Sequence, residues 1–148
     1  MESPWGVIMV PGAKEFFAEV RAAYVELADE LPLVGPVESD LVGPSTSYAG
    51  GQIEYSIFLD RREGVVFCTV ELDSVSSRLR AGLEEVAVAS GVVERRGRIS
   101  ESARNMKQMK KSLLGQVEYV RLVHSVLSGE GAEQVMRDAG AKESPKRA

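Results

Sequence analysis

Apolar and polar residues alternate strictly in two neighbouring segments, 52–60 and 65–73. Alternation of this kind predicts β-strands that bury one face. Four residues separate the two segments, and a connection of that length predicts an antiparallel hairpin in which Ile57 lies opposite Cys68. Segment 45–49 precedes a Gly-Gly pair and predicts a third strand, because a two-stranded hairpin alone is marginally stable in water.

Four other segments place apolar residues three and four positions apart, which predicts helices with one buried side. They are residues 11–31, 73–90, 100–128 and 132–139. Ser100 is expected to cap the longest of these helices with its side-chain hydroxyl. The second half of that helix is apolar on more than one side, which indicates deep burial or contact with a second copy of the chain.

The remaining segments lack a clear period. Gly-Pro pairs and acidic residues predict a loop over 33–44, whereas 92–99 fits either an edge strand or an extended linker. Residues 142–148 are expected to be a frayed tail. The chain is therefore expected to form a single α+β domain over 1–141. In this domain a short antiparallel sheet, a three-stranded meander, packs against helices in two layers, with a long C-terminal helix.

Composition is that of a globular protein. The 148 residues are 44% hydrophobic and 27% charged, and the single cysteine, Cys68, excludes an internal disulfide. The apolar run 5–10 follows the acidic Glu2 and is broken by Pro11, so neither a signal peptide nor a membrane span is expected. A soluble protein of the cytoplasm is therefore expected.

Charge is distributed unevenly along the chain. The net charge is −4, but residues 94–111 alone carry +5, so the rest of the chain carries −9. We call the cationic residues of this segment the basic belt: Arg95, Arg96, Arg98, Arg104, Lys107, Lys110 and Lys111. The net negative charge disfavours nucleic acid as a partner. The basic belt is the one segment whose charge would attract it.

The supply of reactive residues disfavours catalysis and points to no cofactor. The chain has one histidine, which excludes sites built from several imidazoles, and it has no glycine pattern for phosphate or dinucleotide binding. Cys68 and His124 are formally available as a nucleophile–base pair. Cys68 falls on the apolar face of its strand, where a buried thiol is unreactive. His124, on the apolar side of the long helix, is expected to be a core histidine.

The other face of the predicted hairpin places Glu54 opposite Glu71 and Phe58 opposite Phe67. Two neighbouring carboxylates suit acid–base chemistry or a divalent metal. They also fit a solvated position, an ion pair with an arginine of the chain, or a basic partner. An aromatic pair rimmed by acids is typical of a protein-binding surface, unless a helix or the segment 5–10 covers it.

The basic belt predicts an alternative site, because clustered positive charge attracts phosphate groups. On an ideal helix Arg104, Lys107 and Lys111 lie within about 60° of one another. No aromatic residue occurs between Phe67 and Tyr119, which argues against binding of single-stranded nucleic acid. The belt also fits a solvated helix face, or a surface that neutralises the acidic first helix.

The order of elements and the acidic character resemble those of small acidic bacterial binding proteins, such as secretion chaperones and toxin-immunity proteins. This resemblance implies a binding role and no particular site. We expect a non-catalytic protein-interaction module that binds or sequesters another protein, in particular a basic one, and that self-associates through the long helix. Its binding residues are expected to be Glu54, Phe58, Phe67 and Glu71.

Two other functions stay open from the sequence. The first is binding of an anion or a nucleic acid by Arg95, Arg96, Arg98, Arg104, Lys107 and Lys111. The second is a small-molecule enzyme that uses Glu54, Glu71 or His124.

Overall fold

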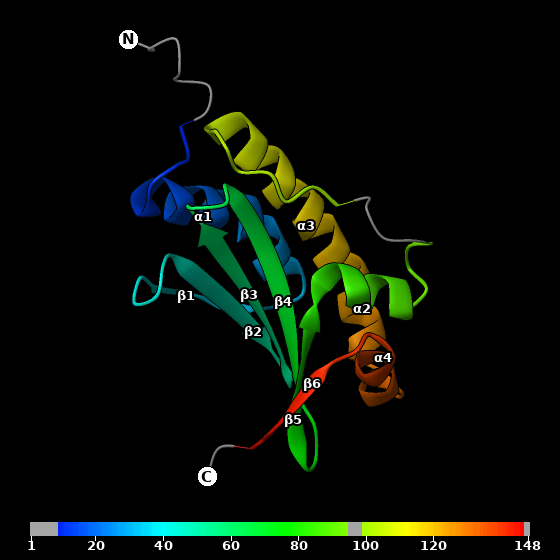
Figure 1. Cartoon of the computed structure of the whole chain (residues 1–148). Helices are drawn as coiled ribbons and strands as arrows, with labels where there is room; N and C mark the ends of the chain where they lie inside the picture. The colour runs from blue at the N-terminus through cyan, green and yellow to red at the C-terminus, as the bar shows by residue number, and fades with distance from the viewer. Residues whose placement is uncertain (1–8, 95–98, 147–148) are drawn as a thin grey trace.

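The computed structural model describes residues 9–94 and 99–146, and within them the chain is an α+β protein, as the sequence predicts. In chain order the elements are α1 (Ala13–Glu30), β1 (Val34–Ser39), β2 (Ser45–Gly50), β3 (Ile53–Asp60), β4 (Val65–Asp73), β5 (Ser77–Gly82), α2 (Leu83–Ala89), α3 (Met106–Leu127), α4 (Ala132–Asp138) and β6 (Lys142–Pro145). Figure 1 shows their arrangement.

The six described strands form one antiparallel sheet in which each strand pairs with the next one along the chain. β3 and β4 form the predicted hairpin, with Ile57 opposite Cys68. β2, the third predicted strand, pairs with β3 over its whole length. Both predictions are thus confirmed. They could be made from the sequence because a two-residue period with one buried face specifies both the strand and its register.

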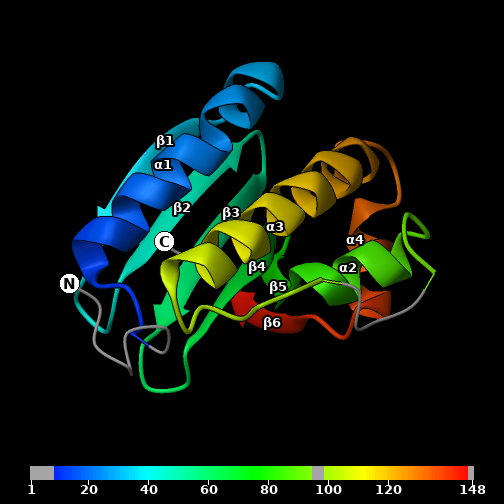
Figure 2. The same cartoon turned by 90° about the horizontal axis from the view of Figure 1, so that it is seen from above.

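One face of the sheet carries the core. α1 and α3 lie side by side against it (Figures 1 and 2), and α2 and α4 pack next to α3. Phe16 and Tyr24 of α1 belong to one core cluster with the inward side chains of the hairpin, such as Ile57 and Val70, and all four are fully buried. Burial of side chains of this size contributes about 1.5–3 kcal/mol each, so this face holds most of the stabilising contacts.

The longest helix, α3, uses its apolar surface inside the chain. Its second half buries Val117, Val120, Val123 and Leu127, while Leu122 is 43% exposed. Part of the apolar surface that suggested contact with a second copy is thus buried within the chain. None of the described helices is long and apolar enough to cross a membrane.

The helix predicted over 73–90 is wrong in its first half. That half forms the strand β5, which pairs with β4, and the helix α2 covers only seven residues. Leu79 and Leu83 lie four positions apart, which suits a helix, but burial alternates along β5, which defines a strand. Val75, placed by the sequence on the apolar stripe of the helix, is 94% exposed.

The sheet is also larger than the predicted three-stranded meander. β1 lies within the predicted loop 33–44, and β6 lies within the predicted tail 142–148. Both are edge strands with mostly exposed side chains, so neither has the alternation that reveals a half-buried strand. β6 pairs with β5 through its backbone. The hydroxyl of Ser77 on β5 also donates a hydrogen bond to Glu143 Oε2 on β6 at 2.5 Å.

The long helix begins later than predicted. Asn105, not Ser100, caps it, and the Asn105 side chain accepts a hydrogen bond from the backbone of Gln108 at 2.9 Å. The preceding residues run along β4, where the Val66 N–H donates to the Glu101 carbonyl at 2.7 Å. Of the ambiguous segment 92–99, residues 95–98 lie outside the described part of the chain, and the described remainder forms no strand.

Candidate functional site

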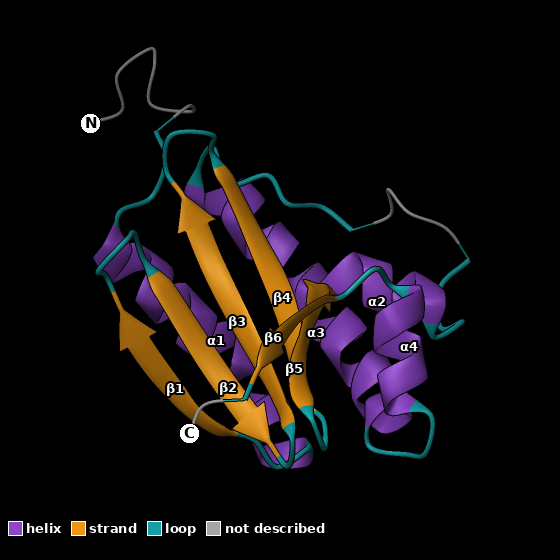
Figure 3. Cartoon of the chain, turned by 60° about the horizontal axis from the view of Figure 1, so that its bottom comes forward, coloured by secondary structure: helices purple, strands orange, loops and turns teal. Residues whose placement is uncertain are grey.

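The candidate site is the outer face of the sheet, opposite α1 and α3. In Figure 3 this face is turned forward and the helices α1 and α3 lie behind it. The alternation that buries one side of β3 and β4 directs their remaining side chains to this face, where they are half-buried. Among them are Glu54, Ser56 and Phe58 of β3, and Phe67, Thr69 and Glu71 of β4. All four sequence-predicted binding residues are thus brought onto one surface.

Phe58 and Phe67 form a stacked pair across the two strands. Their ring centroids are 5.2 Å apart and their planes differ by 19°. The guanidinium of Arg80, on β5, lies 5.5 Å from the centroid of Phe58, within the range of a cation–π contact. An aromatic pair of this kind is worth about 0.5–1.5 kcal/mol beyond its buried area.

A hollow of about 420 Å³ opens beside this pair, and we call it the aromatic hollow. Its wall is mainly apolar and includes Phe58, Phe67, Val42 and Pro44, the last two from the loop between β1 and β2. Val42 is fully exposed, and its neighbour Leu41 is 93% exposed. Fully exposed aliphatic side chains beside an aromatic pair are characteristic of surfaces that other molecules cover.

The two predicted glutamates face each other but have different surroundings. Glu54 lies opposite Glu71, and Arg78 donates to Glu71 Oε2 at 2.6 Å. The expected alternative in which an arginine of the chain meets a carboxylate therefore holds for Glu71. Within residues 9–94 and 99–146, the Glu54 side chain makes no hydrogen bond or ion pair.

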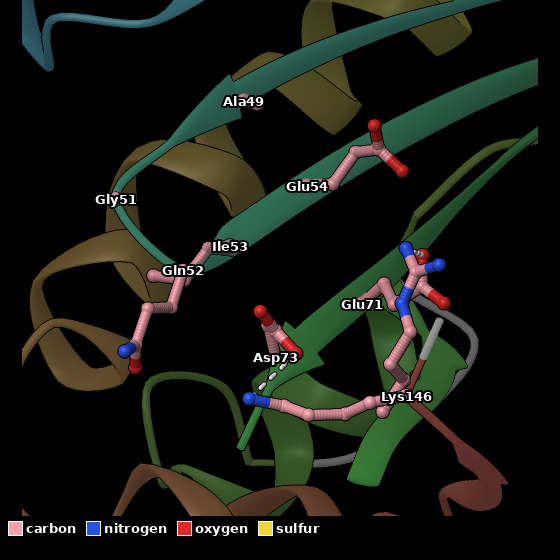
Figure 4. A pocket seen from close by; sticks show the side chains of 9 residues that line it. Ala49, Gly51, Gln52, Ile53, Glu54, Glu71, Asp73 and Lys146 are labelled. Carbon is pink, nitrogen blue, oxygen red and sulfur yellow. Dashed lines mark hydrogen bonds and ion pairs between the residues drawn. The ribbon is translucent and has the colours of Figure 1, made fainter. Parts of the chain in front are cut away.

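A second, polar hollow of about 360 Å³ surrounds these glutamates. Figure 4 shows Glu54 on β3, Glu71 and Asp73 on β4, and Lys146 reaching Asp73. Lys146 Nζ lies 3.5 Å from Asp73 Oδ1. Two of the three carboxylates that line the hollow are thus paired with cations of the chain, and no group of residues among those described has a metal-binding arrangement.

Cys68 and His124 do not form a catalytic pair. His124 Nδ1 is hydrogen-bonded to the hydroxyl of Tyr55 at 2.7 Å, and burial lowers the pKa of His124. Cys68 is buried, and burial raises the pKa of its thiol to about 12. A thiol that stays protonated at neutral pH is a poor nucleophile, so both residues behave as core side chains.

The basic belt is only partly described by the structure. Arg95, Arg96 and Arg98 lie outside the described residues. Lys107 and Lys111 are exposed on α3, but Arg104 precedes the helix. The prediction that Arg104, Lys107 and Lys111 share one side of a helix is therefore wrong for Arg104. Arg104 instead lies next to the turn between β3 and β4: a Cβ built on Gly64 would be 3.0 Å from Arg104 Cγ.

The structure adds residues that the sequence did not single out. Arg78 and Arg80 reach the outer face because β5 is a strand, whereas the sequence placed them on a helix. A third hollow, of about 310 Å³, is lined by three acids, Glu84, Glu85 and Glu101. Burial raises the pKa of Glu101, and the charges of Glu84 and Glu85 raise it further. The sequence pattern placed Glu84 and Glu85 on the helix predicted over 73–90 and Glu101 on the next one. It gave no sign that the three acids lie together.

Comparison with protein-family models, with curated proteins and with solved structures finds no match to this chain.

Proposed function

We propose that this chain is a protein-interaction module that binds another protein through the outer face of its sheet. The observation that carries the proposal is the stacked pair of Phe58 and Phe67 on a face that none of the described helices covers. Half-buried aromatic side chains on a sheet lose the rest of their exposure to water when a partner covers them. That burial is the main source of binding free energy at such a surface.

The composition of the face fits this role. The aromatic pair is surrounded by polar and charged side chains, among them Ser56, Thr69 and Arg80. An apolar centre with a polar rim is the usual anatomy of an interface between proteins, and arginine and aromatic residues are its most common anchors. The expected binding residues are Phe58 and Phe67 as anchors, with Glu54 as the carboxylate that a cation of the partner approaches.

Anion binding is the second candidate. It is favoured by the position of Arg104, which lies next to the turn that carries Arg61 and Arg62 and so concentrates positive charge at one end of the sheet. A cytoplasmic location, a strictly two-layered arrangement and self-association through α3 stay predictions from the sequence.

A capture experiment with matched variants tests the proposal. Tagged wild-type chain, Phe67→Ala and Leu114→Ala are exposed to lysate at low and at high salt, and the captured proteins are identified by mass spectrometry. Leu114 is the control because it is 59% exposed on α3, on the helical side of the molecule. A specific protein that is retained by wild type and Leu114→Ala, but lost with Phe67→Ala, supports the proposal. Captured nucleic acid that high salt releases supports the second candidate instead.

A further inference from the structure

The aromatic hollow lies at the end of the sheet where two connections meet. One is the loop between β1 and β2, which contributes Val42 and Pro44, and the other is the turn between β3 and β4. Phe58 and Phe67 form its apolar wall on the outer face. The site is therefore a hollow with an apolar lining. Such a hollow binds one bulky apolar side chain better than a flat surface would.

The residues that line this hollow include two arginines and one carboxylate, Asp60, so they carry a net charge of +1. Arg61 and Arg62 line it, and neither side chain makes an ion pair among the described residues. The carboxylate of Asp60, also at the rim, is engaged by the turn itself: its Oδ1 accepts from the backbone N–H groups of Arg62 and Glu63 at 3.0 and 3.1 Å. Glu63 is the one other acid of this turn, and it is exposed.

Two further arginines extend the positive charge around the hollow. Arg80 lies over the ring of Phe58. Arg104 follows Ala103, whose N–H donates to the Gly64 carbonyl at 2.8 Å, so Arg104 is fixed beside the turn of Arg61 and Arg62. The Arg104 side chain likewise makes no ion pair among the described residues.

The opposite end of the outer face differs in charge. There Arg78 is paired with Glu71 and Lys146 with Asp73, whereas Glu54 makes no ion pair among the residues that the structure describes. Arginines without an ion pair thus lie beside the aromatic hollow, and a carboxylate without one lies at the far end of the strands. The acids Glu84, Glu85 and Glu101 line the separate third hollow, which Phe67 also borders. A partner segment that fills the hollow meets arginines first.

We infer that the aromatic hollow binds a bulky apolar side chain carried by an acidic segment of the partner protein. The inference rests on the proposed function, and at this end of the face it replaces the basic partner expected from the sequence. The apolar side chain covers Phe58 and Phe67, and the flanking carboxylates reach Arg61 and Arg62. Charge complementarity of this kind acts mainly on specificity and on the association rate.

The direct test is an NMR titration of the full ¹⁵N-labelled chain with three synthetic peptides at concentrations up to about 1 mM, which detects weak affinities. The probe is Glu-Glu-Phe-Glu-Glu with blocked ends. One control has lysine in place of glutamate, and the other has alanine in place of phenylalanine. The probe is expected to shift the amide signals of Val42, Phe58 and Phe67, and both controls to bind at least about tenfold more weakly. Equal or tighter binding of the lysine peptide, or no shift at these residues with any peptide, overturns the inference.

Two charge-reversal variants locate the effect. The double variant Arg61→Glu with Arg62→Glu is expected to lower the affinity for the probe at least about tenfold and to raise the affinity for the lysine peptide. Lys107→Glu with Lys111→Glu makes the same change of net charge on α3 and is expected to leave both affinities unchanged. If the α3 variant has the larger effect, the peptide binds the basic belt and the inference fails. The proposed function fails separately, if Phe67→Ala leaves capture of the partner protein unchanged.

Two other occupants of the hollow give distinct results, and each overturns the inference. If the hollow signals respond to no peptide in the full chain but do respond after removal of residues 1–8, the segment with Trp5 occupies the hollow. If the same signals shift with protein concentration alone, a second copy of the chain does.

Discussion

The hydroxyl of Tyr55 on β3 lies 2.7 Å from Nδ1 of His124 on α3, and this hydrogen bond joins the sheet to the longest helix within the core. Both residues are buried, so the bond satisfies polar atoms that would otherwise be costly to remove from water. It also gives the one histidine of the chain a place in the core.

The buried histidine predicts a pH dependence of stability. Burial lowers the pKa of His124 below its ordinary value of 6.5, so the unfolded chain takes up a proton before the folded chain does. The free energy of unfolding is therefore expected to be highest above pH 6.5 and to fall as the pH drops from 6.5 towards the folded pKa. Urea denaturation between about pH 7.5 and pH 5.5 measures this, in a range where carboxylates of ordinary pKa stay ionised. Glu101, whose pKa is raised, acts in the opposite direction, because its protonation favours the folded chain as the pH falls. His124→Asn is expected to flatten the profile, and an unchanged slope would mean that another group titrates.

The hairpin register predicts a large difference between two nearby substitutions. Ile57 is fully buried between the sheet and the helices, so Ile57→Ala should lower the free energy of unfolding by about 2–4 kcal/mol through loss of packing. Arg61 is exposed in the turn, and Arg61→Ala should change it by less than about 0.5 kcal/mol. Urea midpoints of the two variants provide the measurement, and similar midpoints would contradict the assigned core.

The two opposed glutamates should respond differently to neutralisation. Glu54→Gln removes a like-charge repulsion and is expected to leave stability unchanged, or to raise it by about 0.2–0.5 kcal/mol. Glu71→Gln breaks the ion pair with Arg78 and is expected to lower stability by about 0.5–1 kcal/mol. Thermal or urea unfolding of both variants compares them directly. Equal effects would show that the Arg78 pair does not distinguish the two carboxylates.

The last strand should contribute measurably to the sheet. Removal of residues 142–148 deletes β6 and its backbone pairing with β5, and is expected to lower stability by at least about 1 kcal/mol. It should also speed amide hydrogen exchange at Arg78 and Arg80. Removal of residues 147 and 148 alone is the control. Unchanged exchange at β5 after the longer deletion would mean that β6 does not protect this edge.

The sequence predicted the elements whose own pattern is unambiguous. β3 and β4 alternate over eight and nine residues, so their register and the positions of Phe58 and Phe67 followed from the period alone. β5 is short, and the spacing of Leu79 and Leu83 fits a helix equally well. β1 and β6 were missed because an edge strand with two exposed faces has no alternation to detect.

The same distinction applies to the candidate site. The four residues of the hairpin face were predicted, because they depend only on the local register. The contacts of Arg78 and Arg80 with this face were not, since they depend on β5 being a strand next to β4. The position of Arg104 beside Gly64 depends on the late start of α3, which the apparent cap at Ser100 concealed.

The central claim is that the outer face of the sheet binds a partner protein through its aromatic pair. Its most direct test is the dissociation constant of the captured partner, measured for Phe67→Ala and for the control Leu114→Ala. Phe67→Ala is expected to weaken binding by at least about 1 kcal/mol, as an anchor residue does, while its urea midpoint falls much less than that of Ile57→Ala. Leu114→Ala is expected to bind as wild type does. Equal affinities of the two variants, with both folded, would contradict the claim.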